Sequence, residues 1–355
     1  MQCGGRNERV DDEAGNRGMK SPLLEVSDLA VRFSTRGGGV VDAVSDVSFD
    51  LAPGETVALV GESGSGKSTL GLALMGLTGV TRPGSVSGAA TLSLKNGTRQ
   101  DMMKLSDRAM QAIRGNEVAM IFQEPMSSLN PVHTVGWQIC EAVTCHQGIS
   151  SSAAAASALE LLGKLGIPDP GRCLHAYPHQ LSGGMRQRVM IAIALSCQPS
   201  LLIADEPTTA LDVTVQAQIL ELLKHVQEET GMAILFITHN FGVVAEVAQR
   251  TMVMYAGRVV EAGPVGDVFH APRMPYTRAL LESLPRLDRG FATRLPAIPG
   301  QVPSPSALPP GCAFHPRCRH AVPGRCDDRL PTLEACSNDH LVRCVRWSEL
   351  AAPGS

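Results

Sequence analysis

The sequence predicts an α/β protein built on a parallel sheet, with a helical insertion and a small C-terminal extension rich in cysteine and proline. Three apolar runs predict strands that are buried on both faces: 55–61, 201–205 and 232–239. A glycine-rich loop and a helical pattern follow the first run. The helix between the other two runs is amphipathic, and its apolar face consists of Val215, Ile219, Leu222, Leu223 and Val226. This order of strand, helix and strand is typical of a parallel sheet.

Other stretches predict antiparallel strands and helices. Residues 23–33 and 40–51 alternate apolar and polar side chains, which indicates two half-buried strands joined by the turn "STRGGG". Residues from about 132 to 198 are mostly helical in pattern. Residues 250–263 predict a hairpin that turns at Ala256–Gly257.

Composition argues against several classes of protein. The 355 residues have a net charge of −3 and only 4% aromatic residues, which does not suit a nucleic-acid-binding protein. Residues 1–22 are polar and do not resemble a signal peptide, and runs such as 232–237 are too short to cross a bilayer. We therefore expect a soluble, non-exported protein without a nucleic-acid partner. In a reducing cytosol, five scattered cysteines would be free thiols: Cys3, Cys140, Cys145, Cys173 and Cys197.

A phosphate-binding loop is predicted at 61–69, where "GESGSGKST" fits the pattern G-x-x-x-x-G-K-[ST]. Gly64 and Gly66 allow backbone N–H groups to turn toward phosphate oxygens, and the next helix directs its positive N-terminal end at the same anion. Lys67 would reach the β- and γ-phosphates, and Ser68 would offer its hydroxyl to Mg²⁺. The alternative is a chance glycine loop, but its place between a buried strand and a helix argues against that.

An acidic pair follows the apolar strand in "LLIADEPTTALD", residues 201–212. Asp205 could reach the Mg²⁺ shell, and Glu206 could orient or deprotonate an attacking water. Taken alone, such a pair is often a helix cap or a solvated edge. A chain that already contains a phosphate loop favours the catalytic interpretation.

A third motif, "LSGGMRQR" at 181–188, resembles the signature of ATP-binding cassette (ABC) proteins. Gln123 in "IFQEP", "ALD" at 210–212 and His239 complete the family's elements in order. The resemblance covers about residues 23–285. It implies a P-loop NTPase fold with a RecA-like parallel core, an antiparallel β subdomain and a helical subdomain at about 124–198.

The resemblance also implies roles for individual residues. Glu206 and His239 would be catalytic, Glu206 as the base and His239 as the contact to the γ-phosphate. Phe33 would stack on adenine, although a Phe on an alternating strand is otherwise a core residue. Mg²⁺ would be bound by Ser68, Gln123 and Asp205. ATP would contact Phe33, Gly61, Ser63, Gly64, Gly66, Lys67, Ser68, Thr69 and Gln123.

The signature implies a partner chain. A serine and two glycines at a helix N-terminus make an anion site, yet the chain already has its phosphate loop. In the family, two cassettes stack head to tail, and each signature caps the ATP bound by the other. The residues that would bind the partner's ATP are Ser182, Gly183, Gly184 and Gln187.

Further stretches resemble one branch of the family, the ATPase subunits of oligopeptide, dipeptide and nickel importers: 124–139, 270–286, 298–305 and 311–318. The branch implies peptide import, with two membrane permease subunits, a second ATPase subunit and an extracytoplasmic substrate-binding protein. The chain would lie on the cytoplasmic face of the cell membrane, and residues 124–180 would receive the permease. Nickel import and a non-transport ABC ATPase are the alternatives. A paralogue is the expected second ATPase, although a homodimer stays open.

Five of the ten cysteines lie in the last 44 residues. Their spacing lacks the paired C-x2-C units of a zinc ribbon, and an odd count in the cytosol disfavours disulfides. Four thiolates could bind a [4Fe–4S] cluster, with zinc or a redox-silent tail as alternatives. The family resemblance assigns the ligands to Cys312, Cys318, Cys326 and Cys344 and leaves Cys336 as a spare. We expect no route from this tail to the nucleotide site, and hence a stabilising or regulatory role.

Three segments follow from these patterns. Residues 1–21 would be a flexible lead-in, and residues 22–285 the ATP-binding domain. Residues 286–355 would form the oligopeptide/dipeptide-transporter extension, and eight of the 24 prolines lie at 285–316, next to its start.

Overall fold

The computed structural model describes most of the chain, in six stretches: 21–35, 38–78, 84–124, 128–209, 211–284 and 297–350. Residues 1–20 of the expected lead-in, with Cys3, and the expected boundary at 285–286 lie outside the described residues. Within the part of the chain that is described, no helix is long and apolar enough to cross a membrane.

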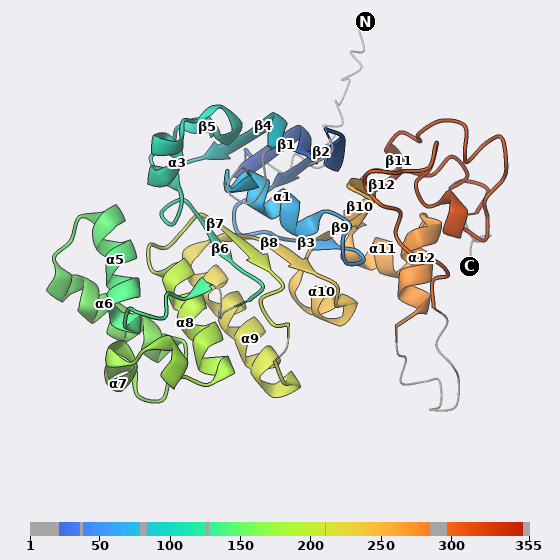
Figure 1. Cartoon of the computed structure of the whole chain (residues 1–355). Helices are drawn as coiled ribbons and strands as arrows, with labels where there is room; N and C mark the ends of the chain where they lie inside the picture. Colours follow the sequence, from blue (N-terminus) through green and yellow to red (C-terminus); the bar gives the residue numbers. More distant parts are fainter. Residues whose placement is uncertain are drawn as a thin grey trace, which may run out of the picture.

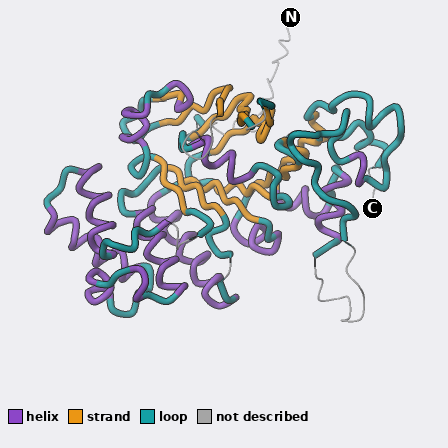
Figure 2. Tube along the Cα trace, viewed as in Figure 1, coloured by secondary structure: helices purple, strands orange, loops and turns teal. Residues whose placement is uncertain are grey.

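The centre of the molecule is an eight-stranded sheet in the order β11-β12-β10-β9-β3-β8-β7-β6 (Figures 1 and 2). The three apolar runs form three of its strands, as predicted. The run of β6, β7, β8, β3 and β9 is parallel, whereas β10, β12 and β11 pair antiparallel. The bounds are β3 Thr56–Val60, β6 Val118–Ile121, β7 Leu201–Asp205, β8 Ala233–Thr238, β9 Arg250–Tyr255, β10 Arg258–Pro264, β11 Glu334–Ser337 and β12 His340–Val342. Every residue of β3, β6, β7 and β8 is buried, which explains their continuous apolar sequence.

A second, antiparallel sheet has the order β2-β1-β4-β5. The two alternating runs form its β1 and β2, with Leu24 opposite Leu51, as the pattern predicts. Its buried face packs over α1 in one continuous core with the central sheet. The bounds are β1 Leu24–Ser34, β2 Val40–Leu51, β4 Gly84–Ser93 and β5 Arg99–Asp101, followed by η1 Met102–Lys104 and α3 Asp107–Ile113.

The helices divide into two groups. Those of the helical region gather beyond the β6 edge of the central sheet, and the others flank the sheet itself (Figure 1). Polar side chains cap the first turns, as Thr134 does for α5 and Asp212 for α9. The helical region contains α5 Val135–Gln147, α6 Ser151–Lys164, α7 Pro170–His175, η2 Pro178–Gln180 and α8 Gly183–Leu195. The others are α1 Lys67–Leu74, α9 Val213–Thr230, α10 Phe241–Val247, α11 Val265–His270 and α12 Pro275–Glu282.

The cysteine-rich extension lies at the opposite edge of the central sheet and is mostly loop (Figure 2). Its regular structure, within the described residues, is η3 His315–Arg317 and the strands β11 and β12. Strand β12 pairs with β10, with Val342 opposite Glu261, so the extension continues the sheet of the ATP-binding core. Phe314 packs with Tyr255 and Tyr276 in a shared apolar cluster.

Candidate active site

The predicted site residues gather where four neighbouring parallel strands end. The phosphate loop follows β3, Gln123 follows β6, Asp205 ends β7, and His239 follows β8. These strands are adjacent in the sheet, so their carboxyl ends meet along one edge. The topology therefore brings together residues that are up to 178 positions apart in the sequence, from Gly61 to His239.

The phosphate loop needs glycine at two positions for steric reasons. Gly61 and Gly66 have φ values of 151° and 106°. A Cβ atom on Gly61 would collide with the Met254 carbonyl oxygen, and one on Gly66 would lie 2.6 Å from the Ala43 carbonyl oxygen. The loop can therefore close against β9 and β2 only without side chains at these positions.

Lys67 is buried beneath the loop. Its Nζ donates to the carbonyl oxygens of Gly61, at 2.8 Å, and Glu62, at 3.0 Å. Burial lowers the pKa of Lys67, although the nearby carboxylates of Glu206, Asp205 and Glu62 counteract that effect. An ammonium group that is bonded to carbonyls at the base of the loop can interact directly with an anion bound there.

Ser68 and Asp205 form the second part of the site. The Ser68 Oγ donates to Asp205 Oδ1 at 3.1 Å. Burial, together with the charge of Glu206, raises the pKa of Asp205 despite this hydrogen bond. A hydroxyl beside a carboxylate whose charge is disfavoured by burial is a donor set that suits Mg²⁺. Ser65, in the same loop, has a buried hydroxyl without a hydrogen-bond partner among the described residues.

Glu206 is held by three side chains. Its Oε1 contacts His239 Nδ1 at 3.0 Å, and its Oε2 accepts from Gln123 Nε2 at 3.0 Å and from Thr209 Oγ1 at 2.9 Å. Burial alone would raise the pKa of Glu206, but the hydrogen bonds and charge of His239, with help from Thr209 and Lys67, lower it overall. The carboxylate is therefore ionised, oriented and able to accept a proton from water. Its backbone is left-handed, with φ at 49°.

Thr209 is a site residue that the sequence interpretation missed. The motif "EPTT" contained the signal, because a hydroxyl three residues after Glu206 can turn back onto it. Gln123 contacts Glu206 directly, whereas the sequence assigned it to Mg²⁺ and ATP. Both assignments involve the same small space between Asp205 and Glu206.

The signature residues begin α8. The Ser182 Oγ accepts from the Met185 N–H at 3.3 Å, and Ser182 and Gly183 are exposed. Gln187, grouped with them by the sequence, is instead buried and donates to the Pro207 carbonyl oxygen. In this chain Gln187 therefore connects the signature helix to the loop that follows Glu206.

Three further predicted contacts to ATP lie at the rim of the site. Ser63 is exposed near the tip of the loop, and Thr69 is half-buried on α1. Phe33 is half-buried near the end of β1, opposite Val41, and packs against the main core. A ring in that position has one part in the core and another open to solvent.

The four predicted cluster ligands line one small, almost wholly apolar cavity: Cys312, Cys318, Cys326 and Cys344. Cys336 lies outside it and bonds through its Sγ to the His340 carbonyl oxygen at 3.2 Å. Burial, with the neighbouring thiols, raises the pKa of Cys312 to about 11. Among the described residues, no three His, Cys, Asp or Glu side chains form a group that could hold a metal ion.

The expectation that this tail has no route to the nucleotide site is wrong. Arg317, next to Cys318, forms two hydrogen bonds with the carboxylate of Glu62 in the phosphate loop, at 2.8 and 2.9 Å. The folded extension thus reaches the residue that directly follows Gly61. Sequence reasoning missed it because the two residues are 255 positions apart.

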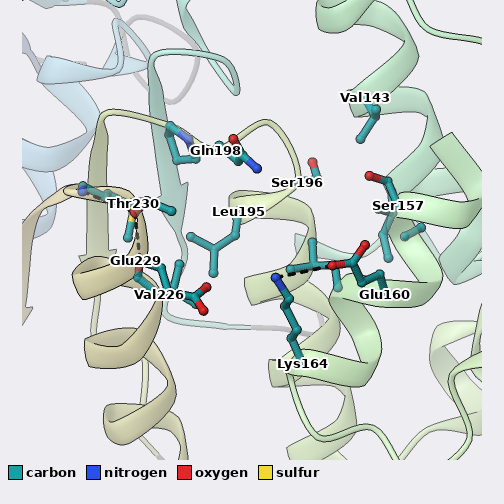
Figure 3. Close-up of a pocket in the computed structure, with 15 residues that line it drawn as sticks. Val143, Ser157, Glu160, Lys164, Leu195, Ser196, Gln198, Val226, Glu229 and Thr230 are labelled. Atoms are coloured by element: carbon teal, nitrogen blue, oxygen red, sulfur yellow. Dashed lines mark hydrogen bonds and ion pairs between the residues drawn. The ribbon is translucent and has the colours of Figure 1, made fainter. Parts of the chain in front are cut away.

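A separate cleft lies between the helical region and α9 (Figure 3). Residues from α5, α6 and α9 line it, including Val143, Lys164 and Val226, and Lys164 pairs with Glu160. None of the predicted nucleotide-site residues is part of its described lining. The cleft is therefore a feature of the junction between core and helical region.

Comparison with known proteins agrees with this geometry. The family model described as "ABC transporter" matches residues 44–209, and the model described as "Oligopeptide/dipeptide transporter, C-terminal region" matches residues 260–326. A Brucella melitensis protein provisionally named a peptide import ATP-binding protein is 53% identical over 341 residues, 94% of this chain and 99% of the relative. The chain belongs to the ATP-binding subunits of the oligopeptide/dipeptide ABC transporter family. The resemblance inferred from the motifs is confirmed.

Other relatives support the same family and fold. The oligopeptide transport ATP-binding protein OppD of Mycobacterium tuberculosis is 51% identical over 327 residues, which are 92% of this chain and 52% of that protein. Among solved structures, the dimeric post-hydrolysis state of the cassette MJ0796 bound to ADP and Pi matches with a TM-score of 0.59 and 28% identity. That match covers 68% of this chain and 99% of the cassette. The ABC cassette fold is therefore confirmed, and the protein is an ABC ATPase for which ATP and Mg²⁺ are expected.

Proposed function

We propose that this chain hydrolyses ATP to power the import of oligopeptides or dipeptides across the cytoplasmic membrane. One observation supports this most strongly: a complete hydrolytic constellation around Glu206 is joined, in one chain, to the C-terminal region of peptide transporters. The relatives' names supply the cargo class. The chain would work on the cytoplasmic face, with a second ATPase subunit, two permeases and an extracytoplasmic binding protein.

In this proposal the residues around Glu206 act on water. The ionised carboxylate accepts a hydrogen bond from the water that attacks the γ-phosphorus in line, and receives its proton as the bond to the β–γ bridging oxygen breaks. His239, Gln123 and Thr209 fix the carboxylate, and His239, the most exposed of the three contacts, faces the γ-phosphate. Lys67 offsets the charge of the phosphates. Mg²⁺, held by Ser68, Gln123 and Asp205, would offset further charge when bound.

The signature would complete the site of a second ATPase subunit. Ser182 and Gly183 are exposed at the start of α8, where N–H groups can face an anion. We propose a head-to-tail pair with a paralogue, in which Ser182, Gly183 and Gly184 contact the partner's ATP. Gln187 acts indirectly, because it is bonded to Pro207 inside its own chain.

A permease docking surface is proposed on the helical region. Several large apolar side chains are exposed there, and Trp137 stacks on His133 with ring centroids 3.7 Å apart. Exposed aromatic and apolar groups of this kind are enriched in interfaces. The exposed residues are Phe122, Val132, Trp137, Leu159 and Tyr177.

We also propose that Cys312, Cys318, Cys326 and Cys344 bind a [4Fe–4S] cluster. Their convergence on one apolar cavity and the exclusion of Cys336 support it. The lack of a compact metal-ligand group among the described residues concerns ligands around a single ion. A cubane needs another arrangement, because each of its four irons takes one thiolate and the sulfurs surround the whole cluster.

The function is tested by reconstituting the chain with the membrane subunits, the second ATPase and the binding protein encoded beside it. Peptide-loaded binding protein should stimulate ATP hydrolysis and drive uptake of the peptide. If Ni²⁺ stimulates and peptides do not, the peptide assignment is wrong. Hydrolysis that ignores every loaded binding protein would contradict a role in import altogether.

The cluster is tested separately on anaerobically purified protein. We expect broad absorbance at about 400 nm and about four irons per chain. Cys318→Ser should lose both signals, whereas the matched control Cys336→Ser should keep them. Colourless protein with stoichiometric zinc would refute the cluster, as would full iron content in Cys318→Ser.

A further inference from the structure

Glu62 has every polar group engaged, although it lies in the phosphate loop. Its N–H donates to the hydroxyl of Tyr276 at 2.9 Å, and its carbonyl oxygen accepts from Lys67 Nζ at 3.0 Å. Both carboxylate oxygens accept from Arg317, at 2.8 and 2.9 Å. Two of these three partners come from outside the loop: Tyr276 from α12 and Arg317 from the extension. The loop is therefore held from the C-terminal side of the molecule.

Arg317 is buried and fully engaged at this contact. Its side chain is only 6% exposed, against 28% for Glu62. Besides the two bonds to Glu62, Nη1 donates to the Tyr255 hydroxyl at 3.2 Å and Nε to the Pro299 carbonyl oxygen at 2.9 Å. A forked, bidentate pair of this kind fixes direction as well as distance, and a lysine could not reproduce it.

The segment that presents Arg317 is itself fixed by aromatic packing. The rings of Tyr255, Tyr276 and Phe314 pack on one another, with centroids 4.5, 5.4 and 5.2 Å apart, and all three are buried. Phe314 and Arg317 both lie between Cys312 and Cys318, which line the thiol cavity. A rearrangement of this segment would therefore displace the guanidinium from Glu62.

We propose that Arg317 is a positioning residue for ATP, through which the C-terminal extension holds the phosphate loop in its binding conformation. The proposal rests on the nucleotide site assigned above. A loop that is already ordered loses less freedom when a ligand binds, so the contact increases affinity for ATP rather than the rate of the chemical step. Linkage is reciprocal, so bound nucleotide should also stabilise the segment around Arg317.

The first test is equilibrium binding of ATP to the full-length chain, measured with a fluorescent ATP analogue. Arg317→Met should weaken binding roughly tenfold, because two charge-assisted hydrogen bonds to the loop are lost. Arg319→Met is the matched control, since Arg319 lies two residues away and pairs with Glu282 on the surface, 64% exposed. The control should bind like wild type. Equal affinity of the two variants would overturn the proposal.

A double-variant comparison covers the case in which Arg317→Met is poorly folded. Glu62→Gln keeps the shape of the side chain and removes its charge, and should weaken ATP binding by a similar factor. The two substitutions together should be no worse than the more severe one, because they remove the same contact. Losses that multiply would show that the residues act independently and would refute the proposal.

Hydrogen exchange supplies a readout that a purely structural role would not change. A non-hydrolysable ATP analogue should slow amide exchange at residues 311–319 in the wild type but not in Glu62→Gln. Exchange that ignores nucleotide in the wild type would contradict the linkage. A wild-type chain that does not bind ATP at all would instead refute the nucleotide site itself.

Discussion

The nucleotide site and the cysteine-rich extension are built in opposite ways. The nucleotide site sits at the ends of buried parallel strands, and its residues fall in short motifs at those ends. The extension has two short strands and one turn of 3-10 helix in its described residues, and its cysteines converge from turns that are far apart in sequence. The first region takes its order from the sheet, whereas the second takes it from side-chain packing against the first.

The two regions are nevertheless in physical contact. Strand β12 continues the central sheet beside β10, and Arg317 reaches the phosphate loop. Arg343 also bonds to β2 and to β10. Substitutions can therefore show where the division between a catalytic core and an appended extension holds and where it fails.

The largest effect should come from the catalytic carboxylate. Glu206→Gln should lower ATP hydrolysis roughly 10²- to 10⁴-fold, because the amide cannot accept the proton of water. ATP binding should persist, since Glu206 is bonded to His239, Gln123 and Thr209 and not to the loop. Steady-state phosphate release and binding of labelled ATP measure the two quantities. Glu229→Gln, on the exposed face of α9, is the control, and turnover near normal in Glu206→Gln would exclude Glu206 as the base.

The next effect should be on binding. Lys67→Ala removes the only ammonium group that bonds to the loop carbonyls of Gly61 and Glu62 within the described residues. We expect the dissociation constant for ATP to rise roughly 100-fold, from the loss of a charged contact to phosphate. Calorimetric titration measures it, with Lys224→Ala on the outer face of α9 as the control. A change confined to turnover would assign Lys67 to the chemical step alone.

The sequence was sufficient for the nucleotide site because each element is local. Gly61 to Thr69, Asp205 with Glu206, and Ser182 to Gly184 are recognisable within a few residues, and apolar runs locate the strands that bring them together. Gln187 and Thr209 were less clear, because burial against Pro207 and a turn back onto Glu206 depend on loop conformation. Strands β4 and β5 were missed, since glycine and serine in β4 obscure the alternation.

The extension was predictable only in part, for a physical reason. The family pattern separated four cysteines from Cys336, and the cavity lining makes the same division. No local signal could indicate that Arg317 meets Glu62 or that β12 meets β10. Those contacts join distant parts of the chain, and a proline-rich segment gives no periodicity from which to infer a partner.

A stability measurement tests whether the extension is an independent unit. Arg343 is buried and donates to the carbonyl oxygens of Val259 and Pro331 and to Asp46. Arg343→Met should lower the free energy of unfolding of the main transition by about 2 kcal/mol, because buried carbonyls lose their donor. Arg325→Met, which breaks only the exposed pair with Glu349, should cost less than about 0.5 kcal/mol. Chemical denaturation measures both, and an unchanged main transition in Arg343→Met would make the extension an independent appendage.

The smallest effect should be a gain in stability at the nucleotide site. Burial raises the pKa of Asp205, so above the ordinary range for aspartate its charge destabilises the folded chain. Asp205→Asn should therefore raise the melting temperature of the nucleotide-free protein at pH 7. The gain should vanish below the ordinary aspartate pKa of about 3.9, where the carboxyl is protonated in both states.

Thermal unfolding across this pH range checks the sign, with the exposed Asp328→Asn as a control that should show no such dependence. The same Asp205→Asn variant should lose ATP hydrolysis, because an amide is a poor ligand for Mg²⁺. Lower stability at pH 7 would mean that Ser68 and Lys67 support the charge better than burial opposes it. The nucleotide site would then stabilise the fold as the extension does, and the contrast between an energetically costly site and a stabilising extension would be lost.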